Sequence, residues 1–135
     1  MKIRIRYRDT DSTGRIFFAS YLEFFDDAIS EFFRDRGITF DTLGSVNFDN
    51  EKKDEIFVVG DCYCRFFHET FYDDILELVL EIKEMREKKV EFEGTFYNKT
   101  RSNTCAKGNM SLICLDTDTN ESTPIPQDLA VRLKS

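Results

Sequence analysis

The chain has 135 residues, of which 41% are hydrophobic and 33% are charged, and its formal net charge is −7 at pH 7. This length suits one domain with a buried core, so a single domain over residues 1–135 is expected. The acidic balance argues against nucleic-acid binding, because phosphates need clustered lysine and arginine. No apolar run approaches the roughly 18 residues of a membrane span, and no secretory signal follows Met1, which indicates a cytoplasmic protein.

The first expected element is a strand, because Ile3, Ile5 and Tyr7 alternate with basic residues in the pattern of a half-buried strand. A helix is expected over residues 18–36, where apolar residues recur at steps of three and four. These residues are Phe18, Tyr21, Leu22, Phe25, Ala28, Ile29, Phe32 and Phe33. Gly37 is expected to end this helix, because glycine favours the backbone conformation that follows a helix C-terminus. Residues 20–23 also read as a capping box, so the helix begins at Ser20 or one turn earlier.

An irregular polar connection is expected over residues 40–55, and four strands follow it, at residues 56–67, 75–83, 89–97 and 104–115. In the second and third of these strands, alternate residues are apolar, so each strand has one apolar face. Short polar turns at residues 85–88 and 98–103 join successive strands into antiparallel hairpins, and two prolines at 124 and 126 end the sheet. The expected fold is α+β, with a curved antiparallel five-stranded sheet around one long helix.

The four cysteines are Cys62, Cys64, Cys105 and Cys114, and none belongs to a Cys-x-x-Cys pair. Cys62 and Cys64 would share one face of a strand, but a zinc site needs two further ligands at matching positions. Buried free thiols are therefore the preferred interpretation, and no metal site is expected.

The most informative segment is residues 7–21, YRDTDSTGRIFFASY, in which an acidic turn runs directly into the helix. A carboxylate such as Asp11 can attack a carbonyl or activate water, while N–H groups at a helix start stabilise the oxyanion. The spacing Asp-Thr-Asp-x-x-Gly-x-aliphatic-aromatic-aromatic-Ala-x-Tyr resembles the signature of hotdog-fold acyl-CoA thioesterases of the 4-hydroxybenzoyl-CoA thioesterase type. Three later segments share this resemblance: Phe71-Tyr72-Asp73-Asp74, Lys89-Val90-Glu91-Phe92 and Pro124-Ile125-Pro126.

The resemblance implies hydrolysis of an acyl-CoA thioester to a free carboxylic acid and coenzyme A, with no cofactor besides the substrate's own coenzyme A. It assigns Asp11 as the catalytic carboxylate, acting as nucleophile or as general base. The backbone N–H of Phe18 would polarise the thioester carbonyl. Gly14, Phe17 and Tyr21 are the residues expected to bind the substrate.

Two positions depart from the family pattern. Many relatives have histidine or tyrosine where this chain has Phe18, whose side chain transfers no proton, although the role of its main-chain N–H is kept. Glu69 stands where relatives commonly have proline, which affects strand geometry more than chemistry.

Coenzyme A carries a 3′-phosphate and a pyrophosphate, so its site needs cations even in an acidic protein. The candidates lie in two turns: Arg86, Lys88, Lys89, Lys99 and Arg101. The alternative is that they are ordinary solvated turn charges. Similar hotdog proteins share such residues across a subunit interface, and pairing would cover an exposed sheet edge, so a homodimer or, by similarity, a homotetramer is expected.

Several residues have a plainer interpretation. Asp9 is expected to be a cap or turn residue, and His68, the only histidine, a surface or packing residue. For the whole protein, a non-catalytic acyl-thioester binding or sensing protein of the same fold is the main alternative function. A hotdog dehydratase ranks lower, because it needs a histidine against the substrate and His68 is outside the acidic turn.

Overall fold

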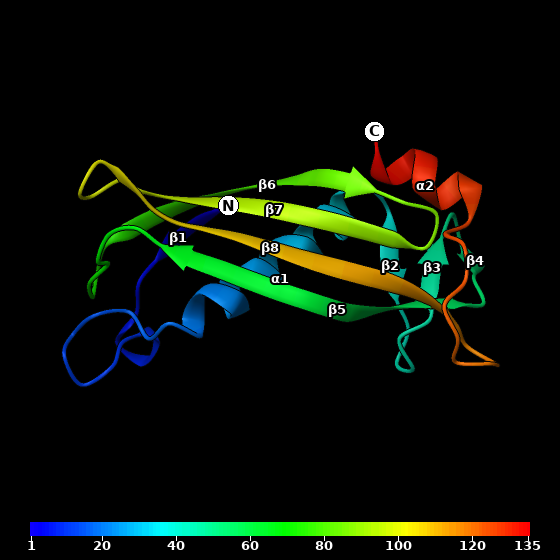
Figure 1. The fold of residues 1–135 in the computed structure, drawn as a ribbon, viewed down its shortest axis with the longest axis horizontal. Helices are drawn as coiled ribbons and strands as arrows, with labels where there is room; N and C mark the ends of the chain where they lie inside the picture. Colours follow the sequence, from blue (N-terminus) through cyan, green and yellow to red (C-terminus); the bar gives the residue numbers. More distant parts are fainter. The chain divides into compact units, whose positions relative to one another are not determined.

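The computed structural model describes residues 1–135, which form a five-stranded antiparallel sheet, a small three-stranded sheet and two α-helices (Figure 1). The large sheet has the strand order β1-β6-β7-β8-β5. Its strands are β1 (Lys2–Arg4), β5 (Glu55–Phe66), β6 (Ile75–Met85), β7 (Lys89–Asn98) and β8 (Asn103–Asp116). The helices are α1 (Ser20–Asp35) and α2 (Gln127–Leu133). The α+β class is confirmed, as are the four long strands, to within two residues at each end.

The chain forms two compact units. The first comprises Met1–Ile29, Tyr63–Glu81 and Glu93–Asn109, and the second comprises Ser30–Cys62, Ile82–Phe92 and Met110–Ser135. No helix is long and apolar enough to cross a membrane.

In the first unit, the buried ring of Phe25 on α1 packs directly onto the sheet at two glycines. A Cβ atom at Gly94 would lie 2.6 Å from Cε2 of Phe25, and one at Gly108 would lie 3.2 Å from the same atom. A side chain at Gly94 would therefore displace the helix or its phenylalanine, because close-packed cores have no free volume for it. The two glycines let α1 approach the strands that carry them.

In the second unit, phenylalanines join the C-terminal turns of α1 to the sheet. The ring of Phe33 stacks on Phe57 with centroids 5.9 Å apart and meets Phe40 edge-on at 5.3 Å. Phe32 meets the buried Phe92 edge-on at 5.1 Å. The helical spacing of Phe32 and Phe33 thus identified positions that pack against the sheet, as expected of an apolar helix stripe.

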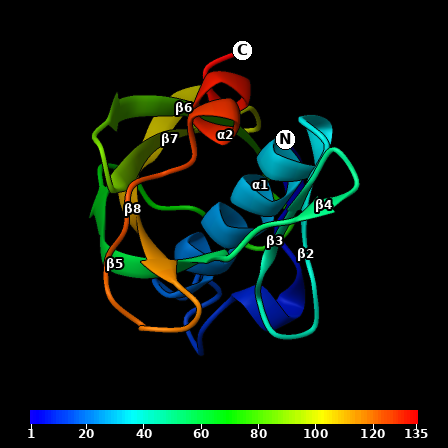
Figure 2. The same cartoon turned by 90° about the vertical axis from the view of Figure 1, so that its right-hand side faces the viewer.

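The connection after α1 is more ordered than its polar sequence indicated. It contains a three-stranded sheet of β2 (Ile38–Phe40), β3 (Val46–Phe48) and β4 (Glu51–Lys52), visible in Figure 2. Val46 and Phe48 are buried on either side of Asn47, but three residues are too short for alternation to stand out. The irregular connection expected there is therefore wrong, and α2 was not expected at all.

Of the two expected starts of α1, the one at Ser20 is confirmed, but the capping box is not formed. The helix begins at Ser20, and the Ser20 hydroxyl donates to the carbonyl of Asp9 at 3.1 Å instead of capping the helix. Among the cysteines, Cys105 and Cys114 are buried, whereas Cys62 is exposed and Cys64 is partly exposed.

Candidate active site

The acidic turn is a tight reversal closed by backbone hydrogen bonds. The N–H of Asp11 donates to the carbonyl of Arg15 at 2.8 Å, and Thr10 pairs with Ile16 in an antiparallel bridge. Gly14 has φ = +78°, the left-handed region that favours glycine, while nothing lies within 4 Å of where its Cβ would be. Its backbone conformation, not a lack of space, therefore explains the glycine. The turn holds Asp11 opposite Arg15.

Asp11 is an exposed carboxylate held by its neighbour. One carboxylate oxygen accepts hydrogen bonds from the Thr13 hydroxyl at 2.6 Å and from the Thr13 N–H at 2.7 Å. These bonds, together with weaker attraction from Arg15, hold the pKa of Asp11 below its usual value. The group therefore stays ionised at neutral pH.

Asp9, in contrast, is buried and structural. Its carboxylate accepts the N–H of Arg6 at 2.8 Å and the guanidinium of the same arginine at 3.2 Å. Its carbonyl accepts the N–H of Phe17 at 2.8 Å. The residue thus fixes the path of the chain into α1, in agreement with its expected role as a turn residue.

The approach to α1 leaves main-chain donors unused. The N–H groups of Ser20 and Tyr21 donate to the carbonyls of Phe17 and Phe18, at 2.9 and 3.4 Å. The N–H groups of Phe18 and Ala19 themselves have no acceptor in the protein. Unpaired N–H groups before a helix are suited to bind a developing negative charge. The structure thus leaves free the donor that the sequence resemblance assigned to Phe18.

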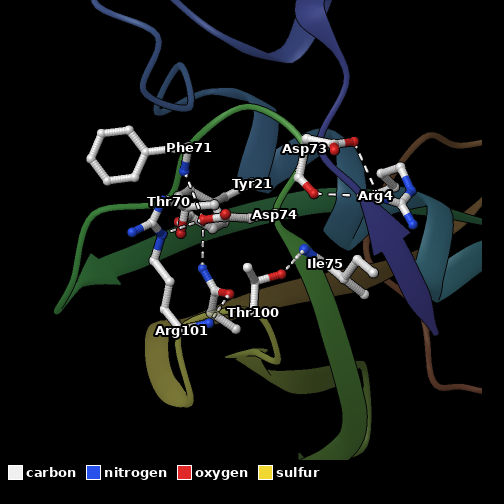
Figure 3. Close-up of polar contacts among 10 residues, drawn as sticks. Arg4, Tyr21, Thr70, Phe71, Asp73, Asp74, Ile75, Thr100 and Arg101 are labelled. Carbon is white, nitrogen blue, oxygen red and sulfur yellow. Dashed lines mark hydrogen bonds and ion pairs between the residues drawn. The ribbon is translucent and has the colours of Figure 1, made fainter.

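A pocket of about 330 Å³ lies next to this donor. It is lined by two segments, one with Arg15, Ile16, Phe18 and Tyr21 and the other covering residues 66–70. Its floor is a buried pair in which the Tyr21 hydroxyl bonds to the Thr70 hydroxyl at 3.0 Å (Figure 3). Burial raises the pKa of Tyr21, so its phenol stays protonated.

The rim of the pocket is polar. Arg15 donates to Glu69 at 2.8 Å, and both side chains are about half exposed. His68 also lines the pocket, although its sequence context indicated a surface or packing role. No motif identifies it, because the second lining segment follows β5, about 50 residues beyond the acidic turn. Only the fold brings His68 to Phe18.

A buried carboxylate holds the turn after this second segment. One oxygen of Asp74 accepts the Phe71 N–H at 2.9 Å, the Asn98 amide at 2.9 Å and the Arg101 guanidinium at 2.8 Å (Figure 3). Burial by itself would raise the pKa of Asp74, but the three donors outweigh it and lower the pKa below its usual value. The Arg101 guanidinium also lies 4.3 Å from the centre of the Phe71 ring. Arg101 is therefore part of the support of this turn.

The remaining basic candidates differ in their partners. Lys99 is paired with Glu77 at 2.9 Å, and Arg86 with Glu84 at 2.9 Å. Lys88 and Lys89, at the hairpin between β6 and β7, form no ion pair. These two lysines therefore keep their charge available for an anion.

The other expected substrate residues divide between pocket and surface. Tyr21 forms the pocket floor, whereas the half-exposed Phe17 is not part of the lining and contacts the Phe18 ring, with centroids 4.7 Å apart. Asp11 and Gly14 lie in the turn beside the rim residue Arg15 and do not themselves line the pocket.

The sequence model of the Thioesterase-like superfamily matches residues 5–133. The acyl-CoA thioesterase YbgC of Helicobacter pylori is 31% identical over 86 residues, covering 64% of this chain and 57% of that protein. The YbgC acyl-CoA thioesterase of Haemophilus influenzae is 26% identical over 127 residues, covering 94% and 88%.

Solved structures share the fold. A 1,4-dihydroxy-2-naphthoyl-CoA thioesterase from Synechocystis superposes with a TM-score of 0.84 at 14% identity, over 98% of this chain and 93% of that one. The fold is therefore the hotdog fold that the sequence resemblance implied. By sequence, the match to the Helicobacter relative spans less than two thirds of that protein's length.

Proposed function

The chain belongs to the thioesterase-like superfamily, and we propose that it hydrolyses an acyl-CoA thioester to the free carboxylic acid and coenzyme A. The observation that carries this proposal is the unpaired N–H of Phe18 beside a largely apolar pocket. An acyl group in the pocket would present its carbonyl oxygen to this donor, where the negative charge of a tetrahedral intermediate is stabilised. The YbgC acyl-CoA thioesterases support the same reaction class.

In this proposal Asp11 is the nucleophile. Its lowered pKa keeps it ionised at neutral pH, which is the form in which a carboxylate attacks a carbonyl carbon. Attack breaks the C–S bond and leaves an acyl-aspartyl anhydride, which water then hydrolyses. Gly14 gives the turn the conformation that presents the carboxylate.

Release of thiol from a panel of acyl-CoA substrates tests the proposal. Straight-chain and aromatic acyl groups should be compared, because a pocket of this size admits either. Hydrolysis should persist after treatment with EDTA, since no metal is needed. Tight binding of acyl-CoA without turnover of any substrate would contradict the proposed thioesterase activity and would favour a binding or sensing protein.

The unpaired lysines give a prediction about coenzyme A. Reversing both charges, Lys88→Glu with Lys89→Glu, should raise KM for acyl-CoA at low salt several-fold and change kcat less, because phosphate contacts far from the carbonyl act as uniform binding. The measurement is steady-state kinetics at two salt concentrations. A short acyl thioester without the nucleotide should be unaffected.

The control for this variant carries the same change in net charge at other exposed lysines, Lys2→Glu with Lys52→Glu. Its KM should stay close to that of the wild type. Equal losses on acyl-CoA and on the short thioester would instead indicate a defect of folding or assembly, and would contradict a coenzyme A site at the hairpin.

We also propose that the functional unit is a homo-oligomer, at least a dimer and by similarity a tetramer. Strand β5 is at one end of the strand order and carries exposed apolar side chains, namely Val58, Val59, Tyr63 and Phe66. An exposed apolar edge strand is typically covered by another chain. Light scattering coupled to size exclusion at micromolar protein should give at least twice 15.9 kDa. A fully active particle of that monomer mass would contradict this prediction.

A further inference from the structure

His68 is placed in the pocket by the way its segment leaves the sheet. After β5 ends at Phe66, the N–H groups of both Phe67 and His68 donate to the same carbonyl, that of Cys105, at 2.8 and 3.2 Å. When two consecutive residues pair with a single residue of the neighbouring strand, they form a β-bulge. Bulges redirect side chains and are frequent beside active sites. The redirected His68 lines the same pocket as Phe18, and its imidazole has no hydrogen-bond partner in the protein.

The other titratable groups of the pocket are committed elsewhere. Arg15 and Glu69 are paired with each other at 2.8 Å. Tyr21 donates its hydroxyl proton to Thr70, and burial raises its pKa, so it does not ionise at neutral pH. His68 is therefore the pocket group that is free both to accept and to donate a proton, and imidazole is the side chain best suited to do so near neutral pH.

The reaction needs such a group at two points. When the C–S bond breaks, the coenzyme A sulfur leaves as a basic thiolate, and when water attacks the anhydride it must lose a proton. Asp11 serves as nucleophile and cannot supply the first proton, because its carboxyl is ionised. The phenyl ring of Phe18 carries no exchangeable proton. Neither Asp11 nor the side chain of Phe18 therefore performs this step.

We propose that His68 is the catalytic acid and base of the thioester hydrolysis, an inference that rests on the proposed function. As Asp11 attacks the carbonyl carbon and the C–S bond breaks, the protonated imidazole gives its proton to the sulfur, which leaves as a thiol. The neutral imidazole then takes a proton from the water that attacks the anhydride, which restores the imidazolium and releases the acid, with Asp11 as the free carboxylate. One water is consumed, and the proton balance is closed over the two steps.

Leaving groups of different basicity test this role. The substrates are two thioesters of the same acyl group, one of N-acetylcysteamine and one of thiophenol, because an alkyl thiolate needs protonation to depart far more than an aryl thiolate does. His68→Gln should lower kcat/KM for the alkyl thioester by about 10²-fold. For the phenyl thioester we expect a loss of only a few-fold. The ratio kcat/KM is used because it reports the steps up to the first irreversible one, which includes thiolate departure.

Two controls separate chemistry from structure. His68→Gln should unfold at a temperature close to that of the wild type, because the side chain is exposed and makes no bond. Free imidazole added to His68→Ala should restore part of the rate with the alkyl thioester. Asp118→Asn, an exposed side chain in the turn after β8, should change neither substrate.

The outcomes are distinct. If the wild type hydrolyses no thioester, the proposed function itself is wrong. If the wild type is active and His68→Gln is unchanged, or loses both thioesters equally, His68 is not the proton donor to the leaving thiolate. A selective loss on the alkyl thioester, with rescue by imidazole, supports the proposal.

Discussion

Asp11→Asn should lower kcat/KM for acyl-CoA by at least about 10²-fold, the loss typical of removing a positioned catalytic group. The asparagine side chain has the same shape and retains an oxygen that can accept the Thr13 hydrogen bonds, so the turn should persist. Its amide, however, is not a nucleophile for a thioester. Because Asp11 is exposed, the unfolding temperature should be nearly unchanged. Steady-state thiol release and a thermal melt check both parts of this prediction.

Asp9→Asn is the matched comparison, because it makes the same chemical change two residues away. Asp9 is buried and bound to Arg6, so this variant should lose stability first, and activity only to the extent that the fold is lost. If a stable Asp9→Asn variant were inactive while Asp11→Asn remained active, the two roles would be reversed. If neither change altered the rate, the enzyme assignment would fail.

Asp74→Ala should lower the free energy of unfolding by about 3 kcal/mol at neutral pH, the largest effect on stability expected from a single polar side chain here. Its removal leaves the Phe71 N–H and the buried Asn98 amide without their acceptor. Arg101 contributes less to the loss, since its half-exposed guanidinium regains water. Denaturant unfolding of both proteins measures the difference. A change below about 1 kcal/mol would contradict the structural role assigned to this network.

The effect of Asp74 should also depend on pH in a definite direction. Its pKa is lower in the folded protein than in an unfolded chain, so its contribution is present above the ordinary pKa of aspartate and is lost as the pH falls through the folded value. The difference between wild type and Asp74→Ala should therefore shrink as the pH falls below about 4. Asp73→Asn is the control, because the neighbouring Asp73 forms only an exposed pair with Arg4, and its loss should cost less than about 1 kcal/mol.

Local sequence patterns determined the main elements of this protein. The period-2 alternation of β6 and β7 and the stripe of phenylalanines on α1 depend on which face of an element is buried, and this periodicity is written in consecutive residues. The acidic turn was identified by its resemblance to the thioesterase signature, in which Asp11, Gly14 and Phe18 stand within eight residues. The backbone reversal and the unpaired N–H of Phe18 agree with what that resemblance implied.

The tertiary structure decided what lies between distant segments. The pocket joins Tyr21 to Thr70, which are 49 residues apart, and it brings in His68 through a bulge that no local pattern marks. Asp74 and Arg101 are joined across 27 residues, so Arg101 supports the turn, and its expected contact with a phosphate stays a prediction. The strands β2 to β4 were missed for a related reason: segments of two or three residues become strands only when packing and partner strands provide their hydrogen bonds. Burial and pairing of this kind depend on contacts between segments, so they were determined only when the chain folded.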